Sequence, residues 1–246
     1  MVRYYCSGFD INNAFGHGLG DMFKSELKDT KSIVYIPAGK ERVEKAKEKY
    51  IPIFKEHFKN VGIKFEQINL ITPELSSEQA KEVIKNASFI MITGGNPFHL
   101  KDMCKELDIL DELKNYQGIM LGYSAGAMLM SKYIIIVPCS EEYPDFHIEE
   151  GLNLDNLSIY PHNNIDSEIY PEYIDVEGEV TRKDDLVRVS GEYGEFFLLQ
   201  DNNNDISIIK SNNGNIEYYT ENNGKIWKVT KDNIILENIN QKNRQR

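Results

Sequence analysis

The chain of 246 residues carries a formal net charge of −11, and 41% of its residues are hydrophobic. This composition excludes a disordered or fibrous class, and the acidic balance argues against nucleic acid as a partner, because phosphate binding depends on lysine and arginine. We expect one α/β domain over residues 1–240, β-rich from about residue 195, followed by a polar tail at 241–246.

Short apolar runs alternate with helical patterns in the first half of the chain, as a parallel α/β sheet requires. Strands are predicted at 2–7, 32–38, 63–70, 89–92 and 118–122. Helices are predicted at 18–29, 40–59, 76–86, 97–115 and 125–132. The helix at 76–86 opens with Ser76-Ser-Glu-Gln79, which is a capping-box pattern.

After Gly194 the pattern changes to short β-prone runs at 195–200, 205–210, 215–220 and 225–230. Asn212-Asn-Gly214 and Asn222-Asn-Gly224 are hairpin signals between them. These strands could extend the main sheet or form a small flap. The sequence therefore predicts a doubly wound, mostly parallel sheet flanked by helices, with a C-terminal antiparallel β-hairpin extension, and ligands at the carboxyl ends of its strands.

Gly122-Tyr-Ser124-Ala-Gly126 matches G-x-S-x-G and lies between a predicted buried strand and a helix-forming segment. A strand, sharp turn and helix constitute a nucleophile elbow, in which small residues let the turn close and hold the serine hydroxyl up for attack. We interpret Ser124 as a nucleophile. The alternative is a tight turn with no chemistry.

Thr93-Gly-Gly-Asn96 follows the preceding strand directly. Glycines let backbone N–H groups approach a substrate, and such loops complete an oxyanion hole with the amide of the residue after the nucleophile. We assign the oxyanion hole to the Gly95 and Ala125 amides. Alternatively, the glycines only make a turn before Pro97.

A serine nucleophile needs a base, and the chain has five histidines. Only His162 follows an apolar, strand-like run downstream of Ser124, at 157–161. A strand end could present its imidazole to the elbow as general base. A structural or surface histidine is the alternative.

These motifs together resemble peptidase family S51, which contains dipeptidase E and cyanophycinase. The resemblance rests on Gly94-Gly-Asn96 with Phe98 and Leu100, on the elbow 122–127, and on Pro161-His162. It implies a serine peptidase that hydrolyses short peptides, with dipeptides bearing an N-terminal aspartate as the expected substrates. It also implies Asn96 as a substrate contact, and neither a cofactor nor a metal.

The resemblance further implies an acidic residue after the histidine, in a turn that follows a late strand. Family members carry a glutamate there, whereas this sequence reads Leu198-Leu-Gln-Asp201-Asn. Asp201 is our candidate for the acid that holds the imidazole tautomer. Glu192 and Glu195 remain rivals, and each acid could instead be a solvated turn residue.

Thr181-Arg182 occupies the place of a Thr-Arg pair whose arginine, in dipeptidase E-like proteins, is positioned to meet the aspartyl side chain of the substrate. A guanidinium suits bidentate carboxylate recognition. A surface arginine on a charged helix is the equally weighted alternative for Arg182.

Three cysteines without a C-x-x-C spacing indicate neither a disulfide framework nor a cysteine zinc site. With no signal-peptide run and no long apolar segment, we expect a cytoplasmic protein that contacts no membrane. Its partner would be a small peptide, and a homodimer is possible. The rival functions are a cyanophycinase-like hydrolase of β-aspartyl-arginine chains and a non-catalytic protein that binds a small ligand in the same crevice.

Overall fold

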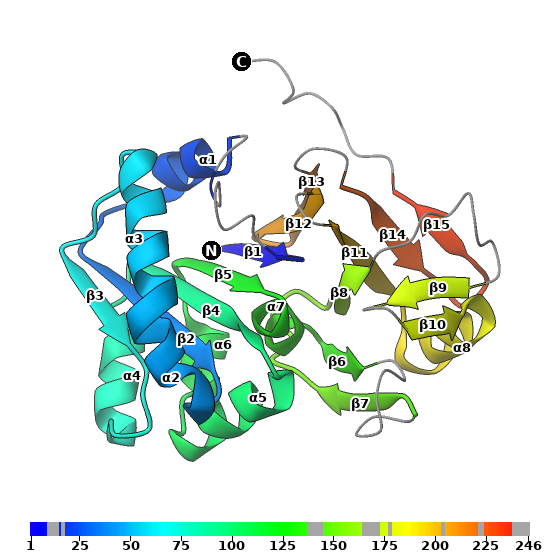
Figure 1. Ribbon diagram of the computed structural model, residues 1–246, viewed down its shortest axis with the longest axis horizontal. Helices are drawn as coiled ribbons and strands as arrows, with labels where there is room; N and C mark the ends of the chain where they lie inside the picture. Colours follow the sequence, from blue (N-terminus) through cyan, green and yellow to red (C-terminus); the bar gives the residue numbers. More distant parts are fainter. Residues whose placement is uncertain are drawn as a thin grey trace.

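The computed structural model of the chain describes residues 1–8, 15, 18–136, 145–163, 173–176, 179–202, 205–220 and 224–237. A large sheet runs through the molecule in the order β10-β9-β8-β11-β12-β1-β5-β4-β2-β3 (Figure 1). The predicted tail at 241–246 and Cys139 lie outside the described residues.

Five parallel strands form the N-terminal half of the sheet. They are β1 (Val2–Cys6), β2 (Ser32–Ala38), β3 (Gln67–Leu70), β4 (Phe89–Gly95) and β5 (Ile119–Tyr123). Most of their side chains are buried, which explains the nearly continuous apolar runs in the sequence. All five carboxyl ends therefore meet at one edge of the sheet, which we call the carboxyl edge.

The C-terminal strands extend the same sheet from β1. They are β8 (Ile159–Asn163), β9 (Tyr173–Val176), β10 (Glu179–Arg182), β11 (Phe196–Asn202), β12 (Asp205–Asn212), β13 (Asn215–Thr220), β14 (Ile226–Val229) and β15 (Ile234–Leu236). Strand β12 is antiparallel to both β1 and β11, and β8 is parallel to β11. Consequently β8 and β11 run in the direction of β1 and β5, and their carboxyl ends share the carboxyl edge.

Helices cover both faces of the parallel half (Figure 1). One hydrophobic cluster joins the sheet to α4 (Ser77–Lys85), α5 (Pro97–Glu106), α6 (Leu110–Asn115) and α7 (Ala125–Met130). A second cluster joins the opposite face to α1 (Leu19–Glu26) and α3 (Ile51–Asn60). The predicted doubly wound α/β fold is confirmed.

Residues 40–60 form one helical run, as predicted, although it begins and continues irregularly. A 3-10 turn, η1 (Lys40–Arg42), leads through α2 (Val43–Lys45) and a π-helical stretch, η2 (Ala46–Tyr50), into α3. Strand β2 therefore ends in a tight turn, and this turn places Arg42 at the carboxyl edge.

A third hydrophobic cluster lies at the C-terminal side of the sheet. Here α8 (Lys183–Tyr193) packs with the two-stranded sheet of β6 (Tyr133–Ile136) and β7 (His147–Glu150) over β8, β11 and β14. The sequence analysis did not predict β6, β7, β9, β10 or β15.

Two local predictions are wrong. The helix predicted at 97–115 is broken, because α5 ends at Glu106, Asp108 adopts a φ of 55° and α6 begins at Leu110. The second hairpin is also not formed by the described strands, since β13 pairs with β12, whereas β14 pairs with β11 and β15. The first hairpin is confirmed: Asn213 and Gly214 both have positive φ, as a type I′ turn requires.

The capping box at the start of α4 is confirmed, with the Gln79 amide N–H donating to the Ser76 hydroxyl and the Ser76 N–H donating to the Gln79 side chain. In the part of the chain that the structure describes, no helix is long and apolar enough to cross a membrane.

Candidate active site

Ser124 lies at the sharp turn between β5 and α7. Its φ of 50° and ψ of −120° are unusual for a residue with a side chain, and cost strain that the surroundings must hold. The Ser124 amide donates to the Cys6 carbonyl at 3.1 Å, and the Ser124 carbonyl accepts from Met128 at 3.1 Å. This is the backbone geometry that a nucleophile elbow requires.

The two glycines that flank Ser124 are required by close packing. A Cβ on Gly126 would lie 2.2 Å from the Ile92 carbonyl oxygen, and a Cβ on Gly122 would lie 2.6 Å from the Gly126 carbonyl carbon. Larger residues at either position would push α7 away from β4 and β5. The G-x-S-x-G spacing therefore follows from the contact of the elbow with its neighbouring strands.

The glycine loop after β4 touches the elbow. A Cβ on Gly94 would lie 3.0 Å from the Ser124 Cβ, so the backbone of the loop lies directly against the predicted nucleophile. Gly95 has a φ of 149°, and a Cβ there would lie 2.8 Å from the Ala38 Cβ. Ala125 is the first residue of α7, so its N–H has no acceptor within the helix. Both predicted oxyanion donors thus belong to segments that meet at Ser124.

Asn96 follows the loop and caps α5. Its side-chain Oδ1 accepts hydrogen bonds from the Phe98 and His99 amides, at 2.9 and 3.2 Å. This cap fixes the side chain and, with it, the end of the glycine loop. The predicted contact of Asn96 with substrate stays a prediction.

His162 and Asp201 lie near the carboxyl ends of neighbouring parallel strands, β8 and β11. Asn163 is level with Gln200, so His162 precedes and Asp201 follows this paired position. For both residues the structure describes the backbone. Because β8 and β11 run in the direction of β5, both residues lie at the carboxyl edge, where Ser124 also lies.

The strands that carry His162 and Asp201 pack against the helix that follows Ser124. Ile159 of β8 and Leu199 of β11 belong to the same buried cluster as Ala125 and other residues of α7. Helix α7 contacts β8 directly. The core therefore joins the three chain segments of the predicted triad.

The rival acids lie at the other end of β11. Glu195 immediately precedes β11, and its carboxylate pairs with Lys228 at 2.6 Å. Glu192 lies in the last turn of α8, where a hydrogen bond to its carboxylate raises the pKa of Tyr193. Asp201 lies six positions after Glu195 along an extended chain, which corresponds to about 20 Å.

Arg182 is the last residue of β10 and pairs with Tyr173 of β9. Since β9 is antiparallel to both β8 and β10, β10 runs parallel to β8. Val176 is level with Asn163, so the backbone of Arg182 lies about 10 Å beyond the end of β8. Arg182 is thus placed on the His162 side of the carboxyl edge.

Arg42, which the sequence analysis did not single out, lies on the opposite side of the elbow. Its Nε would be 3.5 Å from a Cβ on Gly95. A single arginine in a Lys/Glu-rich helix forms no motif. The sequence therefore points to Arg42 only through its position just after the strand 32–38.

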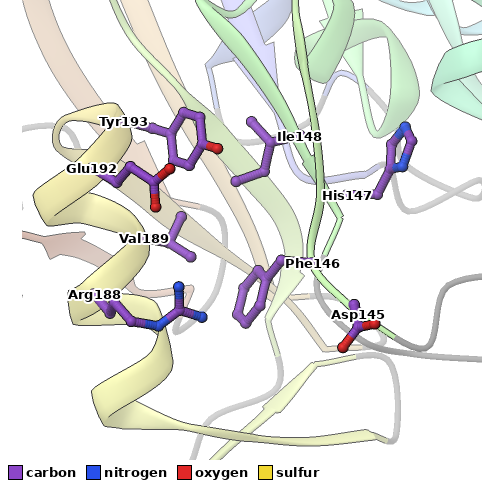
Figure 2. A pocket seen from close by; sticks show the side chains of 8 residues that line it. All are labelled: Asp145, Phe146, His147, Ile148, Arg188, Val189, Glu192 and Tyr193. Carbon is purple, nitrogen blue, oxygen red and sulfur yellow. The ribbon is translucent and has the colours of Figure 1, made fainter.

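A cavity of about 430 Å³ lies between β7 and α8. Figure 2 shows Phe146, Ile148 and Tyr193 pointing into it, while His147 points away. The His147 ring instead packs edge-on against Phe98, with 4.7 Å between the ring centroids. This contact brings β7 beside the first turn of α5, which follows the glycine loop.

Among the described residues, no group of three or more His, Cys, Asp and Glu side chains is arranged to hold a metal ion. Burial raises the pKa of the Cys104 thiol to about 12, which leaves it protonated and unreactive at neutral pH.

The fold and the elbow together define an α/β protein with a serine at a strand-to-helix turn on the carboxyl edge. The sequence profile of Peptidase family S51 matches residues 7–211. The chain belongs to this family.

One sequence relative and two solved structures are similar to the chain. Peptidase E of Nostoc sp. strain PCC 7120 is 30% identical over 142 residues, which cover 54% of this chain and 52% of the relative. The match thus spans about half the length of that relative. A peptidase from an acI-B1 Actinobacterium has a similar structure, with a TM-score of 0.62, 16% identity and coverage of 98% of this chain and 95% of the other. A candidate peptidase E from Listeria monocytogenes EGD-e gives a TM-score of 0.55 at 17% identity, over 89% and 97% of the two chains. These two likenesses support the fold.

Proposed function

We propose that this chain is a serine peptidase that hydrolyses short peptides, with dipeptides bearing an N-terminal aspartate as the preferred substrates. The observation that carries the proposal is the contact between Ser124, held at a φ of 50°, and the glycine loop at Gly94. A nucleophile and a set of backbone donors for an oxyanion then lie side by side, as acyl transfer requires.

In the proposed mechanism the Ser124 hydroxyl attacks the scissile carbonyl while His162 takes its proton. The negative charge that develops on the carbonyl oxygen is stabilised by the Gly95 and Ala125 N–H groups. His162 then protonates the leaving amine, and water hydrolyses the acyl-enzyme with His162 acting again as base. Asp201 orients the imidazole and stabilises its positive charge.

Three features support this assignment of the triad. The strands of His162 and Asp201 end at the same edge as β5, and they are neighbours in the sheet. Buried side chains of both strands belong to the same hydrophobic cluster as those of α7. The rivals Glu192 and Glu195 precede the amino end of β11 instead. Family membership and the match to peptidase E support the reaction class.

The proposed preference for N-terminal aspartate rests on the likeness to peptidase E and on a cation at the carboxyl edge. Arg182 is one candidate for binding the aspartyl carboxylate, since a guanidinium can form two parallel hydrogen bonds with it. The neutral asparagine analogue would lose this charge-assisted pair.

The test has two parts. A fluorophosphonate probe should label wild-type protein at Ser124, identified by peptide mass spectrometry, and should not label Ser124→Ala. A panel of Asp-X, Asn-X and Ala-X dipeptides, together with β-aspartyl-arginine, should then show turnover by wild type that is abolished in Ser124→Ala. Labelling of Ser124→Ala to the same extent, or full turnover by it, would contradict the proposed nucleophile. Preference for β-aspartyl-arginine would move the substrate to the cyanophycinase type.

A further inference from the structure

Arg42 and Ser124 lie on opposite sides of the Gly94-Gly95 pair. A Cβ on Gly94 would be 3.0 Å from the Ser124 Cβ, and a Cβ on Gly95 would be 3.5 Å from the Arg42 Nε. Because adjacent Cα atoms are about 3.8 Å apart, the guanidinium and the hydroxyl are separated by a distance on the order of 10 Å. This is comparable to the length of a dipeptide.

The turn that carries Arg42 is fixed at both ends. The Arg42 amide donates to the Gly39 carbonyl at 3.1 Å, and Ala38 is level with Gly95 in the sheet. Gly39 has a φ of 108°, and a Cβ there would lie 2.6 Å from a Glu41 carboxylate oxygen. The backbone therefore holds Arg42 beside the glycine loop.

Arg42 is half-buried, and within the described ranges its guanidinium forms no ion pair or hydrogen bond. The nearest carboxylate in sequence, Glu41, is bound by the His99 Nδ1 at 2.9 Å, and the Arg42 charge acts on it without a direct ion pair. Arg42 is also close enough to Tyr123, the residue before the elbow serine, for its charge to act on the Tyr123 hydroxyl. Partial burial of a guanidinium without a counter-charge is unfavourable, so such a side chain favours the binding of an anion.

From these contacts we propose that Arg42 binds a carboxylate of the peptide while Ser124 attacks the scissile carbonyl. The inference rests on the proposed peptidase function and deepens it. Both carboxylates of an aspartyl dipeptide lie close to the scissile carbonyl, one on the side chain of the acyl residue and the other at the end of the leaving residue.

Kinetics on three substrates separates the two sources of the carboxylate. Aspartyl-leucine compared with asparaginyl-leucine reports on the side chain, and aspartyl-leucine compared with aspartyl-leucinamide reports on the terminal carboxylate. In Arg42→Ala one of these two ratios of kcat/KM should fall about ten- to hundred-fold from its wild-type value, and the ratio that falls identifies the carboxylate. Arg42→Lys should retain part of the preference, because it keeps the charge without the planar fork.

The matched control is Arg188→Ala, which removes an exposed arginine of α8 that pairs with Asp185 at 3.8 Å. It should leave both ratios unchanged. Wild-type ratios in Arg42→Ala, or no preference for either carboxylate in wild type, would overturn the inference while leaving the peptidase proposal intact.

A binding measurement separates failure of the inference from failure of the proposed function. Calorimetric titration of Ser124→Ala with aspartyl-leucine should give an affinity that drops at least about ten-fold when Arg42→Ala is added. If wild type hydrolyses no peptide but this drop is seen, the peptidase proposal fails and the carboxylate site stands. If Ser124→Ala binds no dipeptide, or binds it equally well with and without Arg42, the carboxylate site is refuted.

Discussion

Arg3 and Asp155 form an ion pair of 3.1 Å in which both side chains are only 4% exposed. Asp155 also accepts hydrogen bonds of 2.6 Å from Tyr5 and from Ser211. Asp155 lies in the segment that connects the β6–β7 sheet to β8, and Tyr5 and Ser211 belong to β1 and β12. The pair therefore ties the segment before His162 to the centre of the sheet.

Removing the Asp155 carboxylate should strongly destabilise the fold. Asp155→Ala leaves a buried guanidinium unpaired, and breaking such a pair costs about 3–5 kcal/mol of unfolding free energy. Urea unfolding followed by circular dichroism measures the loss. Ser211→Ala removes a single hydrogen bond and should cost about 1 kcal/mol, whereas the exposed Asp184→Asn should stay within about 0.5 kcal/mol of wild type. An Asp155→Ala loss no larger than that of Ser211→Ala would show that the ion pair is dispensable.

Gly126 and Gly191 should respond to alanine in opposite directions. The added methyl group of Gly126→Ala meets the Ile92 carbonyl at 2.2 Å, so the elbow must shift, at a cost of about 1–3 kcal/mol and with loss of activity. In Gly191→Ala the closest atom is the Lys231 Cβ at 3.8 Å, so the substitution should stabilise α8 by about 0.5–1 kcal/mol. Thermal unfolding of the two variants provides the comparison. A stable and active Gly126→Ala protein would mean that the elbow is not tightly packed against β4.

Asp201→Asn should preserve the fold and lower kcat by about four orders of magnitude, because the amide no longer holds the imidazole in its catalytic tautomer. Glu192→Gln and Glu195→Gln are the matched controls, each replacing a carboxylate by an amide near the opposite end of β11. Glu195→Gln weakens only a partly exposed pair with Lys228, worth less than about 1 kcal/mol. Loss of turnover in either glutamine variant, with an active Asp201→Asn, would transfer the acid role to that glutamate.

Alkaline pH should unfold the protein cooperatively. Burial raises the pKa of Tyr4, Tyr5 and Tyr35 above the usual tyrosine range and that of Cys104 to about 12. The folded state therefore keeps these protons at a pH where the unfolded state has lost them, so stability is full below about pH 9 and falls as pH rises further. Within this window each such group can lower the free energy of unfolding by about 1.4 kcal/mol per pH unit.

The measurement is tyrosinate absorbance at 295 nm combined with circular dichroism during a rise in pH. The buried tyrosines should ionise in one step that coincides with loss of secondary structure. Gradual ionisation of all tyrosines before any loss of structure would contradict the assigned burial.

The parts of the fold that follow from local patterns could be predicted from the sequence. The strand at 32–38, the capping box at Ser76 and the turn at Asn213-Gly214 each depend on neighbouring residues, and each is confirmed. The break between α5 and α6 was missed because Asp108 adopts a left-handed conformation within an otherwise helical pattern. The prediction of the second hairpin is wrong because β14 pairs with β11, and this pairing is set by tertiary contacts and not by the local sequence.

At the candidate site, too, features that depend on neighbouring residues could be predicted from the sequence, whereas features that depend on tertiary contacts could not. Ser124 and its glycines carry a motif, and their close packing is a local property of the elbow. The place of Arg42 depends on the contact between the ends of β2 and β4, which no spacing in the sequence reveals. The sequence alone favours Asp201 over Glu195, but the edge of the sheet at which β11 ends follows only from the pairing of β11 with β12 and β8.

The central position of β1 has a consequence for synthesis on the ribosome. Its partners lie far along the chain, at Ile119–Tyr123 on one side and at residues 208–212 on the other. The edge of β1 that faces β12 stays unpaired until residues 208–212 have been made, and pairing across such a sequence separation is slow. The nascent chain therefore carries an unpaired edge of β1 after β5 has been made, and this edge finds its partner only after β12 has left the exit tunnel.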